Sequence, residues 1–238
     1  MHSEINHNDR HVLLHATTNH LLGDHKELFR MFYDVIARQC LSVIFQPIID
    51  LESTKVFGYE GMIRGPSNSL LHSPTKLFSL AQQCGMDYEF ENLCCKIVVE
   101  QFTELQLGGV LLLKRSYSLP NCCKSNSEDT HKIVQQAKLE PERVVVVLDA
   151  KSTGGDSDPD LIWQNYFCYR SLGFQVALDN QGIFLSSLES RLEISPAFVK
   201  FERYFIENID QDPVKAQFVN NLLESANKIG RASCRERV

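Results

Sequence analysis

The sequence predicts an α/β fold and, within that class, a TIM-like (β/α) barrel. Short apolar runs alternate with segments of helical periodicity along the chain, which is typical of strand–helix units around one sheet. One run, Arg143–Leu148, holds four consecutive valines, as expected of a strand that is covered on both faces. Neither GxGxxG nor GxxxxGKS/T occurs, so the doubly wound nucleotide-binding folds lack their usual fingerprint.

Six strands are expected from apolar runs of strand length. The first two flank a turn, and the others are separated by helical segments or loops. They cover Ser42–Ile49, Lys55–Ile63, Gly109–Leu113, Arg143–Leu148, Phe174–Leu178 and Ala197–Phe201.

Helices are expected around these strands. Ser73–Pro74 places an N-cap before a proline at the first helical position, and Gly85 is suited to end that helix. The remaining helical patterns are an amphipathic lead-in from about Gly23 to Arg38, a long helix with Phe90 and Leu105 on its inner side, a short piece at Ile133–Ala137, Leu161–Leu172, and a last helix from Asp212–Pro213.

Composition excludes several classes of protein. The chain has 238 residues and a formal net charge of −6, which argues against a broad basic face for nucleic acid. No run approaches the roughly 18 apolar residues of a membrane helix, and the N-terminus has no apolar signal region, so a cytoplasmic protein without a membrane segment is expected. The eight cysteines form no CxxC pair and are interpreted as reduced thiols.

The first residues differ from the rest of the chain. Six of the eight histidines lie within the first 25 residues, mixed with Asn, Ser and Thr. They are irregularly spaced and no set of Asp, Glu or Cys accompanies them, so residues 1–22 are interpreted as a flexible polar arm. The folded domain is expected to begin at residue 23.

Polar residues follow the expected strands at their carboxyl ends, which is where barrels of this type place their working residues. They predict a ring of charged and amide groups around one mouth. Its members are Gln46, Glu60 with Arg64, Lys114, Asp149, Asp179 with Asn180, and Lys200 with Glu202.

Several of these segments, in order, resemble a bacterial EAL domain. Phe45–Pro66 (FQPIIDLESTKVFGYEGMIRGP) is similar to the family's opening, F/Y-Q-P-I-V-D, a turn, then G-Y-E-A-L-x-R. Leu178–Gly182 (LDNQG) resembles L-D-D-F-G, and Phe198–Phe205 (FVKFERYF) resembles V-K-I-D-x-x-F. Pro141–Leu148 lies where the family has P-E-R and a strand. The resemblance runs from about Leu41 to Gly230 and is closest to the EAL module of multi-domain signalling proteins.

The resemblance implies a barrel-fold phosphodiesterase that opens cyclic di-GMP to linear pGpG with two divalent metals, Mg²⁺ or Mn²⁺. Such cations take oxygen ligands and activate water. The family's barrel also continues beyond the last expected helix, whereas residues 231–238 (RASCRERV) have no strand pattern. We therefore expect an EAL-type barrel over residues 23–230, C-terminally truncated to about six of eight strands, and a non-native or frame-shifted tail at 231–238.

Carried over residue by residue, part of the family's site is kept. Glu60 and Asp179 match metal-ligating carboxylates, and Gln46 and Arg64 match ligand-contacting residues. Lys200 matches the lysine that positions the attacking water.

The other metal positions are lost. Lys114 falls on a ligating asparagine, Val147 on a ligating glutamate, and Asn180 on the second aspartate of a metal-bridging pair. A further acidic position falls on Ala150. An ammonium about 4 Å from a dication would repel it by several kcal/mol even at an effective dielectric of about 20, so no metal is expected to bind.

Two lost or shifted positions have alternative interpretations. Lys114 is either a tethered cation that satisfies Glu60 and Asp179 directly or a side chain that reaches solvent at the mouth. Asp149 either swings toward the site as a substitute carboxylate, if its strand continues that far, or caps the segment that follows.

These losses predict a degenerate EAL domain in cyclic di-GMP signalling, without hydrolytic activity. It would act as a ligand receptor, with Gln46, Arg64 and Lys200 holding a dianion without metal, or as an interaction module for a protein partner or attached signalling domains. The alternatives are an active metal-dependent phosphodiesterase that yields pGpG and an inert fragment.

Overall fold

A computed structural model describes residues 26–115, 123–149, 159–179, 197–200 and 203–229. The polar arm expected at residues 1–22 and the tail expected at 231–238 lie outside these ranges and stay predictions. The chain divides into two compact units, one of Met1–Ser42 with Ile63–Phe90 and one of Val43–Met62 with Glu91–Val238.

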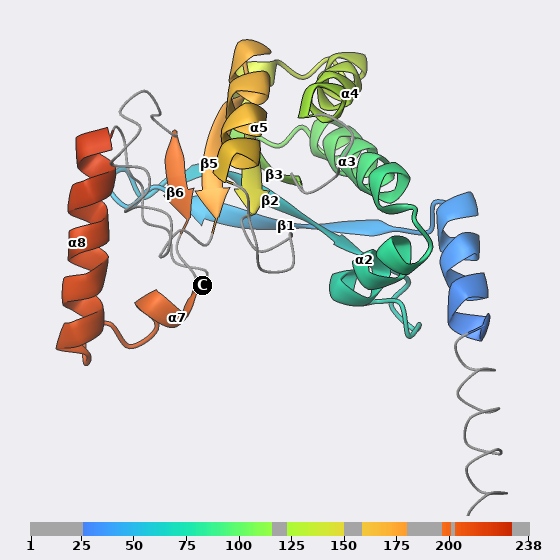
Figure 1. The fold of residues 1–238 in the computed structure, drawn as a ribbon, viewed down its shortest axis with the longest axis horizontal. Coiled ribbons are helices and arrows are strands. Elements are labelled where there is room, and N and C mark those ends of the chain that lie inside the picture. The colour runs from blue at the N-terminus through green and yellow to red at the C-terminus, as the bar shows by residue number, and fades with distance from the viewer. Residues whose placement is uncertain (1–25, 116–122, 150–158, 180–196, 201–202, 230–238) are drawn as a thin grey trace, which may run out of the picture. The chain divides into compact units, whose positions relative to one another are not determined.

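Six strands of the described residues form one sheet, in the order β1-β2-β3-β4-β5-β6 (Figure 1). Neighbours from β2 to β6 are parallel, whereas the short turn between β1 and β2 makes those two an antiparallel hairpin. The strands are β1 Ser42–Ile49, β2 Val56–Arg64, β3 Val110–Arg115, β4 Val144–Asp149, β5 Gln175–Asp179 and β6 Phe198–Lys200. The six expected strands are thus confirmed, with bounds shifted by at most about two residues.

One face of the sheet builds an apolar interior. Its buried centre is Leu112, Val145, Val147 and Ala177, and Ile48, Val110 and Phe198 pack against it. Because β1 contributes Ile48 and β6 contributes Phe198, the first and last described strands reach the same cluster. The rings of Phe57 on β2 and Phe198 on β6 also lie 5.4 Å apart, edge to face. The sheet therefore curls around its interior as in a TIM-like barrel.

The smaller unit holds a helix over residues 26–37 and helix α2, Pro74–Gln83. Its core places the ring of Phe90 5.4 Å from that of Phe32 and 5.1 Å from that of Phe78. Helix α2 begins at proline and ends before Gly85, whose φ of +64° is the left-handed conformation that glycine tolerates. Ser73 occupies the N-cap position as expected, but its hydroxyl makes no capping hydrogen bond.

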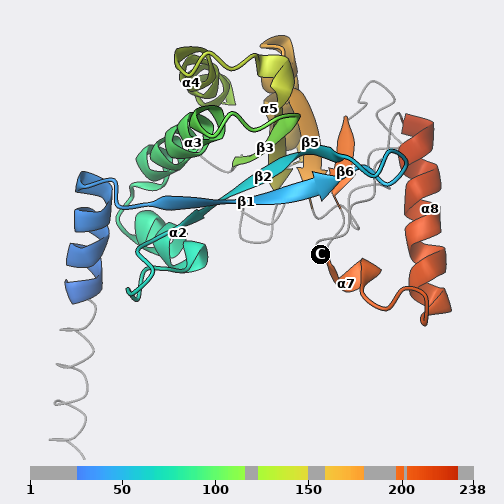
Figure 2. The ribbon, with the colours of Figure 1, turned by 180° about the vertical axis from the view of Figure 1, so that it is seen from behind.

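The helices that follow accompany the parallel strands. They are α3 Asp87–Glu104, α4 Cys123–Gln136, the 3-10 helix η1 Pro141–Arg143, α5 Pro159–Ser171, α7 Arg203–Ile206 and α8 Pro213–Ile229. Figure 2 shows α4 and α5 side by side next to the strands. The expected short piece at Ile133–Ala137 is the end of the much longer helix α4. Helices η1 and α7 were not expected. The Leu105 side chain, expected on the inner side of its helix, is exposed.

Among the described helices, none has both the length and the apolar character that crossing a membrane requires.

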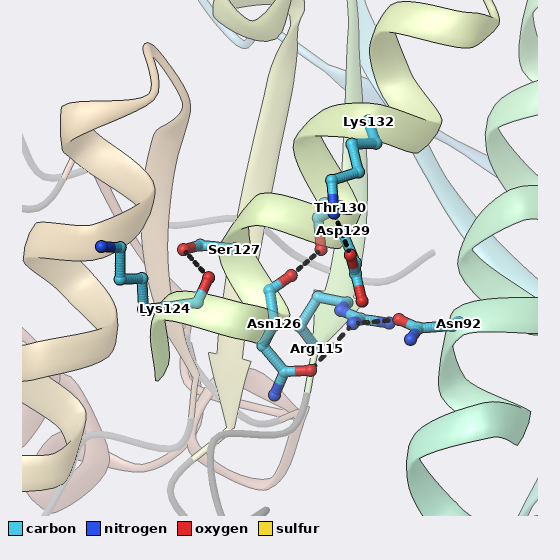
Figure 3. Close-up of polar contacts among 8 residues, drawn as sticks. All are labelled: Asn92, Arg115, Lys124, Asn126, Ser127, Asp129, Thr130 and Lys132. Carbon is cyan, nitrogen blue, oxygen red and sulfur yellow. Dashed lines mark hydrogen bonds and ion pairs between the residues drawn. The ribbon is translucent and has the colours of Figure 1, made fainter. Parts of the chain in front are cut away.

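A buried arginine organises the contact between β3 and the helices. The Arg115 Nη2 group donates to Asn92 Oδ1 of α3 at 2.7 Å and to Asn126 Oδ1 of α4 at 3.3 Å (Figure 3). Its Nη1 lies 3.8 Å from Glu91 Oε2. The hydroxyls of Thr130 and Tyr169, 3.4 Å apart, continue these polar contacts from α4 to α5. Arg115 needs oxygen acceptors in its buried place, and α3 and α4 supply them.

Candidate ligand site at the barrel mouth

The mouth is the edge of the sheet at which the carboxyl ends of the parallel strands meet. Side chains alternate between the two faces of a strand, so a residue two positions after an interior residue faces the same way. Three mouth residues stand two positions beyond members of the interior cluster: Lys114, Asp179 and Lys200. These three members of the expected ring therefore project from the same side of the sheet.

An ion triad lies at this mouth. Lys200 Nζ donates to Glu60 Oε1 at 2.7 Å and lies 3.7 Å from Asp179 Oδ2. The side chains of Lys200, Glu60 and Asp179 are only 16%, 8% and 10% exposed. Asp179 and Lys200 are register partners on adjacent strands, whereas Glu60 belongs to β2, so the triad spans the curled sheet from β6 to β2.

The triad places one ammonium between two carboxylates. Charges at these separations attract strongly where water is scarce, and the geometry satisfies a short charge-assisted hydrogen bond. Lys200, Glu60 and Asp179 therefore hold one another.

Lys114 and Val147 stand next to each other in the sheet, as register partners on β3 and β4. Val147 is completely buried in the interior cluster and offers methyl groups, and the Lys114 side chain is exposed. The ammonium that the described ion pairs place against Glu60 and Asp179 belongs to Lys200. Both interpretations of Lys114, the tethered cation and the side chain that reaches solvent, stay predictions.

Asp149 lies within a strand rather than after one. Strand β4 ends at Asp149, and the backbone of this residue pairs in register with Asp179. The expectation that Asp149 caps the next segment assumed that the strand ends one residue earlier, and β4 continues through it. Its side chain lies outside the described part of the structure.

The other predicted site residues have separate places. Gln46 is a half-buried residue of β1, two positions before the interior residue Ile48. Arg64 ends β2 in the smaller unit, where its Nη1 donates to the Ile63 carbonyl at 2.8 Å. Asn180 and Ala150 lie outside the described residues. The structure thus brings together Glu60, Asp179 and Lys200 of the predicted set.

Sequence reasoning missed the pairing within the triad and the buried Arg115. The signal for Arg115 was its place directly after Lys114 in a strand, since alternation then turns it toward the helices. The signal for the pairing was weaker, because Glu60 and Lys200 are 140 positions apart in the chain.

The described side chains at the mouth do not make up the donor set of a two-metal centre. Mg²⁺ and Mn²⁺ need several oxygen ligands, and the described mouth offers two carboxylates that already share the Lys200 ammonium. Val147 supplies only methyl groups and Lys114 carries a positive charge. Within the described ranges, no group of three or more His, Cys, Asp or Glu side chains is gathered in a metal-binding arrangement.

Comparison with known proteins places this geometry in context. The protein of Escherichia coli (strain K12) named "Probable cyclic di-GMP phosphodiesterase PdeB" is 22% identical over an alignment of 198 residues, and the match covers 78% of this chain and 36% of that protein. The chain thus spans about a third of that relative's length.

Two solved structures share the fold. A standalone EAL protein from Vibrio cholerae O395, in its c-di-GMP bound form, is 21% identical with a TM-score of 0.65, over 82% of this chain and 80% of that one. The Klebsiella pneumoniae BlrP1 complex with manganese and c-di-GMP is 19% identical with a TM-score of 0.67, over 82% of this chain and 49% of that one. The EAL domain family itself matches residues 29–238. The chain belongs to the EAL domain family.

Proposed function

We propose that this EAL domain acts in cyclic di-GMP signalling as a metal-independent receptor for the dinucleotide and does not hydrolyse it. The observation that carries the proposal is the ion triad, in which Lys200 Nζ lies 2.7 Å from Glu60 and 3.7 Å from Asp179. The two carboxylates at metal-ligating positions of the family lie against this ammonium. As a receptor in this signalling system, the domain would work in the cytoplasm, alone or joined to further signalling domains.

The same triad opposes hydrolysis. A lysine that positions an attacking water must point a proton donor at that water, and a metal must polarise it. Lys200 directs its short hydrogen bond to Glu60, and Val147 has no oxygen with which to complete a metal shell. A bound dinucleotide would therefore meet neither an activated water nor a cation that neutralises the leaving oxygen.

Binding of the dinucleotide requires fewer protein groups than its hydrolysis does. Cyclic di-GMP carries two phosphates, and arginine is suited to bidentate contact with phosphate oxygens. Arg64 and Gln46 are retained at positions that the family uses for its ligand. The solved Vibrio cholerae and Klebsiella pneumoniae proteins of this fold hold c-di-GMP in their structures, which supports this ligand for the present chain.

Calorimetry combined with a product assay tests the proposal. The purified chain is mixed with cyclic di-GMP in Mn²⁺ and, separately, in EDTA, while linear pGpG is followed by chromatography. We expect saturable binding in both buffers and no pGpG. Arg64→Ala should weaken binding, and Arg38→Ala, at an exposed arginine of the same unit, should not. Turnover in Mn²⁺ would show an active phosphodiesterase, and no binding by a chain that melts cooperatively would point to a protein-interaction role.

A further inference from the structure

A pocket of about 300 Å³ lies at the opposite end of the strands from the mouth. It belongs wholly to the larger unit and is built from the carboxyl ends of α3 and α4, the segments that follow them, and Arg143 directly before β4. Its walls include the apolar Phe102, Leu107 and Leu139 and the polar Gln106, Lys138 and Arg143. Pockets for small molecules begin at about this volume, and they combine apolar walls with a few polar groups in the same way.

The Arg143 guanidinium is held in a fixed place at this pocket. Its Nε donates to the Gly109 carbonyl at 3.1 Å, and its Nη2 donates to the carbonyls of Leu107 and Gly109 at 2.9 and 3.0 Å. Its Cζ lies 5.6 Å from the centre of the Phe102 ring, within the range of a cation–π contact. These contacts leave Nη1 without an acceptor among the described residues, so it remains available to an oxygen of a ligand.

Equivalent turns present two further polar side chains. At the ends of α3 and α4, the amides of Leu107 and Leu139 donate to the carbonyls five residues earlier at 3.2 and 3.1 Å, which is the bond that closes a Schellman motif. The residue before each leucine has a left-handed backbone: φ is +51° at Gln106 and +56° at Lys138. Glycine is the usual residue at such a position, whereas this chain places an amide and an ammonium there.

The lining of the pocket carries positive charge. Lys138 and Arg143 are cations, and none of the described residues that line the pocket is acidic. Glu104, Glu140 and Glu142 neighbour lining residues in the sequence but do not line it themselves. The pocket therefore favours an anion over a cation or a neutral molecule.

The apolar walls narrow the class of anion. A bare inorganic anion would leave the surfaces of Leu107 and Leu139 uncovered, whereas a ligand with an apolar body buries them. A single carboxylate at the end of such a body suits the donors, because Arg143 and Lys138 both donate to oxygen and neither accepts.

We propose that this pocket binds a small carboxylate with an apolar or aromatic body. The carboxylate accepts hydrogen bonds from Arg143 Nη1 and from the Lys138 ammonium, and the body packs against Leu107 and Leu139. Because the pocket lies away from the mouth, the inference goes beyond the proposed receptor function and does not depend on binding of the dinucleotide.

Nuclear magnetic resonance with two matched probes tests the inference. Naphthoate, and naphthamide as its neutral counterpart of the same shape, are each titrated into the isotope-labelled chain while backbone amide shifts are followed. With naphthoate we expect saturable shifts at Leu107 and Leu139, the residues that close the two turns. Naphthamide should bind about tenfold more weakly or worse, because it lacks the charge-assisted hydrogen bonds.

Substitution of Lys138 tests the same point from the side of the protein. Lys138→Gly removes the ammonium at a position where glycine is favoured, so the melting temperature should stay the same or rise. Binding of naphthoate should weaken about tenfold, and binding of naphthamide should not change. Lys138→Arg should keep most of the affinity. Asn208→Gly is the control, because Asn208 has the same φ of +56° and does not line the pocket.

Each outcome decides the matter. Equal affinities for naphthoate and naphthamide would overturn the selectivity for a carboxylate, and equal binding of naphthoate by Lys138→Gly and the unmodified chain would overturn the role of Lys138. The absence of saturable shifts at Leu107 and Leu139 would overturn the pocket as a binding site.

Discussion

Replacement of Lys200 by methionine removes the ammonium that joins Glu60 to Asp179. At an effective dielectric of about 20, charges separated by 2.7 Å and 3.7 Å attract by about 6 and about 4 kcal/mol before the cost of desolvation is subtracted. The substitution leaves two nearly buried carboxylates without this partner, and breaking a buried ion pair from one side costs about 3–5 kcal/mol. We expect Lys200→Met to lower the free energy of unfolding by about 3 kcal/mol at pH 7.

Urea denaturation followed by the fluorescence of the single tryptophan, Trp163 in α5, measures this loss. Lys132→Met is the matched control, because Lys132 lies 2.9 Å from Asp129 but their side chains are 64% and 34% exposed. Such a surface pair is worth about 1 kcal/mol or less. The double variant Glu60→Gln, Lys200→Met should recover part of the stability. A loss from Lys200→Met no larger than that from Lys132→Met would show that the triad stabilises the fold no more than a surface ion pair does.

Three further expectations concern the rest of the fold. Arg115→Met should lower the free energy of unfolding in urea by about 3 kcal/mol, because it strips polar groups of their buried partner; a loss below about 1 kcal/mol would contradict the described network. Gly109→Ala should lower the melting temperature more than Gly85→Ala does. Both glycines have positive φ, but a Cβ at Gly109 would lie 2.2 Å from a backbone oxygen, whereas a Cβ at Gly85 would touch nothing within 4 Å. Equal losses of melting temperature would contradict this. Burial raises the pKa of the Cys95 thiol to about 11, so this thiol should react slowly at pH 8. Alkylation at pH 8, followed by mass spectrometry, should therefore modify the exposed Cys40 first. Reaction of Cys40 and Cys95 at the same rate would contradict this expectation.

The raised thiol pKa also has a consequence for stability. In the unfolded chain this thiol has its ordinary pKa of 9.0, whereas burial raises the pKa of Cys95 in the folded chain to about 11. The stabilisation is therefore complete below pH 9 and is lost as the pH rises toward 11. Urea midpoints at pH 8 and pH 10.5 measure this, and Cys95→Ala should show a smaller drop.

The strands could be predicted because their signal is local. Runs such as Ser42–Ile49 and the four valines of β4 are apolar over a strand's length, and their neighbours break the pattern with turn residues. The end of β4 was the uncertain point, since an aspartate after five apolar residues resembles a helix cap as much as a strand end. Pairing with β5 decides it, and that pairing is a long-range contact.

Helix α4 could not be predicted from apolar periodicity. Its buried side chains include Asn126, Ser127 and Thr130, so its inner face is polar rather than apolar. Asn126 accepts a hydrogen bond from Arg115 of β3, and Thr130 Oγ1 donates to the Asn126 carbonyl. A pattern that assumes an apolar inner face therefore finds only the last turns of the helix, where Val134 is buried.

The candidate site was predicted in its members but not in its connections. Ordered motifs placed Glu60, Asp179 and Lys200 at strand ends, and parallel strands bring such ends to one edge. Which lysine would hold the carboxylates depended on how far the sheet curls between β2 and β6. No local pattern encodes that curvature, and Lys114 and Lys200 were equally suited by charge.

The most direct test of the account is a titration of Mn²⁺ into the chain saturated with cyclic di-GMP, with free Mn²⁺ followed by electron paramagnetic resonance. A metal-independent receptor should leave Mn²⁺ free from the first additions, without stoichiometric uptake, and should bind cyclic di-GMP with the same Kd before and after EDTA. Uptake of two Mn²⁺ per chain together with formation of pGpG would contradict it.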